Sequence, residues 1–135
     1  MLKKTFTFMD YNGKERTEDH YFNLSKAEIL ELELSVDGGI GAKIERIVSA
    51  QSSPEIFKIF KELILLSYGV KSDDGRRFIK SQEIVDDFVQ TEAYSQLIME
   101  LATDDKAGVN FLQGIMPKDI IDELPENFQD KLSAN

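Results

Sequence analysis

His20 is the first residue to consider for chemistry, because an imidazole can transfer protons near neutral pH and can bind transition metals. It is the one histidine of the chain, which also has no cysteine. A metal site built from His and Cys side chains would therefore lack its further ligands. No serine stands at a recognisable nucleophile elbow that could pair with this imidazole. The pattern predicts a plain surface histidine, next to Glu18 and Asp19.

Two short motifs match ligand-binding loops only in part. The segment 38–43, GGIGAK, has the glycines and lysine of a phosphate-binding loop, but Ile44 stands where that loop needs Ser or Thr. We interpret it as a linker between helices. The segment 73–75, DDG, matches the beginning of a calcium loop, but Arg76 and Arg77 follow it. We interpret it as a β-turn.

Composition and charge exclude several other classes of function. The chain has 135 residues and a formal net charge of -9, which disfavours contact with nucleic-acid phosphates or anionic lipids. The N-terminus lacks the apolar stretch of a signal peptide, and the apolar run 63–70 is too short to span a membrane. The carboxylates are dispersed, and none is marked as a general acid or base. We therefore expect a soluble intracellular protein that is not an enzyme and needs no cofactor, metal, nucleic acid or membrane.

The N-terminal segment 4–22 predicts a β-hairpin. Hydrophobic and polar residues alternate before Asn12-Gly13, a dipeptide typical of tight hairpin turns. A two-residue loop would place Thr17 opposite Phe8, whereas a three-residue loop with a bulge would turn the other face of the return strand inward. The sequence leaves both registers open. Because the return strand is polar, we expect it to lie at an edge of the sheet or to be largely exposed.

The rest of the chain predicts helices with clear start signals. Ser25 and Glu28 form a capping box, and Leu24 and Ile29 fit a hydrophobic staple around it. The longest expected helix, 54–68, should be the central one, because apolar residues cover most of its circumference. The expected helices begin at Ser25, Ile40, Pro54, Ser81, Thr91, Asp104 and Lys118.

These elements predict an α+β fold that is mostly α, with the N-terminal β-hairpin packed on a bundle of five to six helices. We expect a single domain over residues 1–124, with the hairpin at 4–22 and the helical part at 25–124. Residues 125–135 should form a flexible C-terminal tail, because Pro125 ends the last helix.

The apolar residues between 94 and 116 support two interpretations. One is an ordinary hydrophobic core. The other is a groove or self-association face, made adaptable by methionine. If a partner surface exists here, we expect its contact residues to be Tyr94, Leu97, Ile98, Leu101, Phe111 and Leu112.

Four stretches carry a resemblance to a known family. They are DYNGKERTEDHYFNLSKAEILELELS (10–35), IFKIFKELILLSYGVKSDDGRRFIKS (56–81), FVQTEAYSQLIMELATDD (88–105) and NFLQGIMP (110–117). In length and order they resemble the tail assembly chaperones of long-tailed phages (siphoviruses) and prophages of Gram-positive bacteria. The motifs are structural and include no catalytic signature.

The resemblance implies a protein that binds the long hydrophobic tape measure protein, keeps it soluble and helps recruit major tail protein subunits. It implies action in the host cytoplasm and absence from the mature virion. Many members of the family also have a longer form made by ribosomal frameshifting. Two alternatives stay open: a structural tail completion or connector protein of the virion, and a small regulatory protein that binds a host protein.

Overall fold

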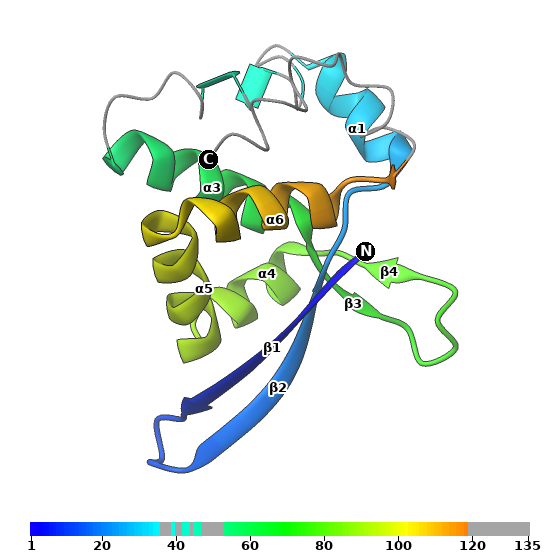
Figure 1. Cartoon of the computed structure of the whole chain (residues 1–135). Coiled ribbons are helices and arrows are strands. Elements are labelled where there is room, and N and C mark those ends of the chain that lie inside the picture. Colours follow the sequence, from blue (N-terminus) through cyan, green and yellow to red (C-terminus); the bar gives the residue numbers. More distant parts are fainter. Residues whose placement is uncertain (36–38, 40–41, 44, 47–52, 119–135) are drawn as a thin grey trace.

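The computed structural model of the chain is drawn in Figure 1. It describes residues 1–35, 39, 42–43, 45–46 and 53–118. The expected helix 40–51 falls largely outside this part of the chain, and so do the expected short helix 118–124 and the expected tail 125–135. The domain boundary at residue 124 therefore stays a prediction.

The fold combines an N-terminal antiparallel sheet with helices, as the sequence predicts. The sheet order is β1-β2-β3-β4, with every neighbouring pair antiparallel. The α5 and α6 helices pack on β1, and α4 packs on β3 and α5. The described elements are β1 (Leu2–Met9), β2 (Glu15–Phe22), α1 (Lys26–Glu33), α3 (Ser53–Ser67), β3 (Tyr68–Lys71), β4 (Phe78–Ile79), α4 (Gln82–Val89), α5 (Glu92–Thr103) and α6 (Asp105–Ile115).

The hairpin adopts the longer of the two loops that the sequence allows. The N–H of Asp10 donates to the carbonyl of Lys14 at 2.8 Å, which leaves residues 11–13 as the loop. Gly13 has φ +78°, the left-handed conformation that a bulge after a type I turn requires. Phe8 therefore lies opposite Arg16, not opposite Thr17. This one-residue shift puts the even-numbered residues of β2 on the buried face of the sheet.

The return strand β2 is an interior strand, so the predicted edge position is wrong, whereas the alternative of an exposed strand fits its first three residues, 15–17, which are all exposed. Its C-terminal end pairs with β3, through Tyr21 with Gly69 and Phe22 with Tyr68. Strands β3 and β4 were not predicted, because their segments are short and the apolar pattern of α3 continues into Tyr68. Gly69 lies within β3. A Cβ atom there would lie 2.6 Å from the Phe78 ring, so this close strand approach needs glycine.

The helix starts agree with the capping signals. At α1 the Glu28 N–H donates to the Ser25 hydroxyl at 3.2 Å, and the Ser25 N–H donates to the Glu28 carboxylate at 2.9 Å. This is the reciprocal capping box. Ser81, Thr91 and Asp104 are the N-cap residues of α4, α5 and α6. Their side chains accept hydrogen bonds from backbone N–H groups of the first helical turn.

The core lies between the inner face of the sheet and helices α3 to α6. The Phe22 ring is at its centre, within 5.5 to 5.8 Å of the rings of Tyr68, Phe88 and Phe111. α3 contributes Ile59, Phe60, Leu63 and Ile64, which are all buried, and this confirms its predicted central place. From α1, only Ile29 is fully buried.

Candidate functional site

The polar cluster around His20 is the first candidate site, and the prediction of a surface histidine is wrong. The side chain of His20 is only 13% exposed. Its ring centroid lies 4.8 Å from that of Phe88 and 5.8 Å from that of Phe6. The bulged register explains the error, since it turns His20 toward the core together with Phe6 and Phe8.

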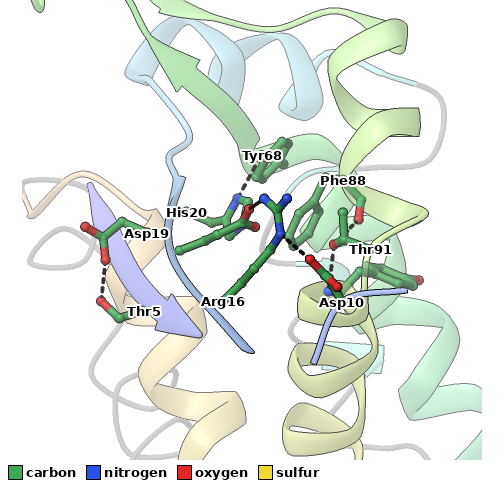
Figure 2. A network of polar contacts seen from close by, with 10 residues as sticks. Thr5, Asp10, Arg16, Asp19, His20, Tyr68, Phe88 and Thr91 are labelled. Carbon is green, nitrogen blue, oxygen red and sulfur yellow. Dashed lines mark hydrogen bonds and ion pairs between the residues drawn. The ribbon is translucent and has the colours of Figure 1, made fainter. Parts of the chain in front are cut away.

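His20 is held from both ring nitrogens. Its Nδ1 lies 2.9 Å from the Tyr68 hydroxyl, and its Nε2 lies 3.0 Å from a carboxylate oxygen of Glu18. Arg16 and Asp10 complete a row of polar side chains that runs from Tyr68 through His20 and Glu18. The Nη1 of Arg16 lies 3.6 Å from Glu18, and its Nε donates to Asp10 at 2.7 Å. Figure 2 shows Asp10, Arg16, His20 and Tyr68 following one another from the hairpin loop toward β3.

The pKa shifts in this row favour an ionised Asp10 carboxylate and a neutral Tyr68 phenol. The hydrogen bond from Arg16 holds the pKa of Asp10 below its usual range. Burial, and then the charges of Asp87 and Glu18, raise the pKa of Tyr68 to about 12. The Tyr68 hydroxyl therefore stays protonated at neutral pH. These contacts connect β2 to β3 and to the hairpin loop, and so hold these parts of the sheet together.

Within the described residues, no group of three or more His, Cys, Asp or Glu side chains could hold a metal ion. In the same part of the chain, no buried side-chain nitrogen or oxygen lacks a hydrogen-bond partner. No described helix is long and apolar enough to cross a membrane.

The six residues predicted to bind a partner lie together, but inside the molecule. Five of them are at most 7% exposed: Leu97, Ile98, Leu101, Phe111 and Leu112. Tyr94 is half-buried, with its ring edge-on to Phe88. A partner would reach the five buried side chains only if α5 and α6 moved apart. Their helical spacing is the same for a core and for a groove, which is why the sequence left both interpretations open. Partner binding by these six stays a prediction.

A groove between α1 and α3 forms a hollow on the described surface. It has a volume of about 520 Å³. Its apolar lining comes from Leu32 of α1 and from Leu65 and Leu66 of α3. A second hollow of about 160 Å³ continues it, and both share Leu32 and Leu66. The charged residues of the larger hollow are Lys43, Arg46, Lys58 and Glu62.

Glu62, the carboxylate that lines the larger hollow, lies near two of its cations. The Nζ of Lys43 lies 3.0 Å from Glu62, and the Nη2 of Arg46 lies 3.9 Å from the same oxygen. The Lys43 side chain is only 8% exposed. Lys58 is exposed and makes no ion pair with the described residues. No sequence motif marks this groove, because its residues come from three separate segments.

The α1 wall of the groove is anchored at its N-terminal end. The Lys80 ammonium donates to the carbonyls of Asn23 and Leu66, at 2.7 and 2.9 Å, and to the Glu28 carboxylate at 2.6 Å. Burial disfavours the charged form of Glu28, but the bonds from Lys80 and Ser25 hold its pKa below the usual value. Lys80 therefore joins the cap of α1 to the C-terminal end of α3.

Two leucines of the α1 segment are largely exposed. Leu30 is 59% exposed and Leu34 is 79% exposed. An exposed leucine pair at i and i+4 on a helix that buries one residue leaves apolar surface for a partner. The fold and groove together define a small α+β protein with surface suited to a segment of another protein.

Comparison with known families agrees with this class. A family model described as phage tail assembly chaperone matches residues 1–133. The match covers almost the entire sequence, so the chain belongs to the phage tail assembly chaperone family. No curated protein and no solved structure gives a significant match to the chain.

Proposed function

We propose that this protein binds the tape measure protein during tail assembly, keeps it soluble and helps recruit major tail protein subunits. The family membership over residues 1–133 is the observation that carries the proposal. The site of action would be the host cytoplasm, before the tail is complete, and the mature virion would not contain the protein. This is a role in holding a client, which needs no catalytic step.

The surface properties of the chain support such a role. A helical client segment with an apolar stripe aggregates when that stripe stays in contact with water. The α1–α3 groove and the exposed pair Leu30 and Leu34 offer apolar surface that could cover it. The net charge of -9 would keep the complex soluble through repulsion between complexes.

Co-expression tests the proposal directly. Helical fragments of the tape measure protein from the same tail gene cluster would be produced alone and together with this chain. We expect at least one fragment to be insoluble alone, to become soluble with the chain and to co-purify with it. Failure of every fragment to gain solubility or to co-purify would refute the proposal.

Mass spectrometry of purified virions separates this proposal from a structural role in the tail. An assembly chaperone should be found in lysates of infected cells and be missing from mature particles. A stoichiometric amount in the particles would instead identify a tail completion or connector subunit.

A further inference from the structure

The larger hollow of the α1–α3 groove is lined by more cations than carboxylates, opposite in sign to the charge of the chain as a whole. Three cations and one carboxylate line the larger hollow: Lys43, Arg46, Lys58 and Glu62. The chain itself has a formal net charge of -9. An acidic ligand is therefore repelled by the molecule as a whole and attracted locally by the larger hollow.

The same groove has an apolar floor suited to a helix. Leu65 and Leu66 of α3 and Leu32 of α1 lie along it, and Leu66 is 37% exposed. Leucines on two neighbouring helices can receive side chains spaced at i, i+3, i+4 and i+7 on a third helix. The hollow of about 520 Å³ holds the apolar side chains of such a helix, with its backbone lying above them.

The two ends of the groove differ in charge, which gives it a direction. The larger hollow carries the cations, while the smaller one is lined by Glu28 and Glu31. Leu32 and Leu66 belong to both hollows and join them. A bound helix with acidic residues beside one part of its apolar stripe would place that part next to Lys58, away from the two glutamates.

We propose that the α1–α3 groove binds an amphipathic helix of the tape measure protein, with its apolar stripe on Leu32, Leu65 and Leu66 and its acidic residues beside Lys58 and Arg46. This inference rests on the proposed function, and it names the surface that carries out that function. The occupant is a client helix with an acidic flank, and the charge at the two ends of the groove sets its orientation.

Matched variants of the full-length chain test the groove. Lys58→Glu reverses an exposed groove cation, and Lys106→Glu makes the same change of charge on α6, outside the groove lining. Leu66→Asn removes part of the apolar floor, and Met99→Asn makes a comparable change at a 61% exposed residue of α5. The probe is a fluorescein-labelled tape measure fragment that the wild-type chain binds, measured by fluorescence anisotropy at two salt concentrations.

We expect Lys58→Glu and Leu66→Asn each to raise the Kd by about 10-fold, with both control variants within about 2-fold of the wild type. The loss caused by Lys58→Glu should shrink at high salt, whereas the loss caused by Leu66→Asn should persist. Circular dichroism must first establish that all four variants fold like the wild type.

Three results would overturn the assignment. Equal weakening by Lys58→Glu and Lys106→Glu would indicate a general charge effect. Wild-type affinity in Leu66→Asn would place the client elsewhere, while the proposed function would still hold because the wild type binds. Sedimentation of the chain without any fragment gives its mass in solution. A difference in that mass between the wild type and Lys58→Glu would identify a second copy of the chain as the occupant. If the wild type binds no fragment at all, the proposed function itself fails.

Discussion

The Nδ1 atom of His20 and the hydroxyl of Tyr68 lie 2.9 Å apart, and this contact joins the N-terminal hairpin to the strand that follows the central helix. The two residues are 48 positions apart in the chain. The Tyr68 ring also stacks on Phe88 of α4, with centroids 4.1 Å apart. The contact therefore fixes the sheet relative to the helices that carry the core.

Removing the Tyr68 hydroxyl should destabilise the fold. Tyr68→Phe keeps the stacked ring but leaves the half-buried imidazole with one partner fewer, so we expect a loss of about 1–2 kcal/mol in the free energy of unfolding. Urea unfolding followed by circular dichroism measures it. Tyr21→Phe is the matched control, because the Tyr21 ring is half-buried on the other face of β2. Equal stability of the two variants would contradict the assigned role of the hydroxyl.

The stability of the protein should fall in strongly alkaline solution. Burial raises the pKa of Tyr68 from 10.0 to about 12. The unfolded state therefore releases this proton at lower pH than the folded state, and the stabilisation present below pH 10 is lost as pH rises toward 12. Tyr94 adds to the same trend, because burial raises its pKa as well.

Thermal unfolding between pH 8 and pH 11.5, together with absorbance titration at 295 nm, measures this effect. We expect Tm to fall more steeply above pH 10 in the wild type than in Tyr68→Phe, since the variant lacks the shifted group. The same slope in both proteins would show that Tyr68 does not control the alkaline transition.

Local signals in the sequence predict most of the helices, because caps act over three or four residues. Ser25 with Glu28, Ser81, Thr91 and Asp104 each start a helix where the sequence places it. The hairpin register could not be predicted, since Asn12-Gly13 fits both loops and the choice depends on what the strand face packs against. Strands β3 and β4 were missed for a similar reason: they are short, and distant partners stabilise them.

The candidate groove was also beyond sequence reasoning. Its leucines are single members of helical patterns that read as core, and its cations Lys43 and Lys58 are far apart in the chain. The predicted partner residues, such as Leu97 and Phe111, have the same periodicity as a partner face but are buried. Only the three-dimensional arrangement separates the covered leucines from the open ones.

An aspartate on the buried side of α5 should lower the free energy of unfolding far more than an aspartate on its exposed side. Leu97→Asp buries a carboxylate at a fully covered position, so we expect a loss of more than about 3 kcal/mol in the free energy of unfolding. Met99→Asp, at an exposed position two residues further on, should change it by less than about 0.5 kcal/mol. Urea denaturation of both variants gives the comparison. A folded, stable Leu97→Asp protein would mean that α5 does not pack as described.

The Lys80 anchor should control how firmly α1 is held. Lys80→Met removes three hydrogen bonds, to Asn23, Glu28 and Leu66, and should cost about 2–3 kcal/mol. Amide hydrogen exchange by mass spectrometry should show faster exchange in α1 than in the wild type, with smaller changes in α5. Lys106→Met is the control for loss of a lysine charge. Unchanged exchange in α1 would remove Lys80 from this role.

Binding of a tape measure segment, the role proposed for this protein, can be measured through the mass of a purified mixture. The chain and a soluble tape measure fragment would be combined and run on a sizing column with light-scattering detection. We expect a new peak that contains both proteins in a fixed ratio, and a reduced share of that peak when Lys58→Glu replaces the wild type. Separate elution of the two wild-type components at micromolar concentration, for every fragment along the tape measure protein, would contradict it.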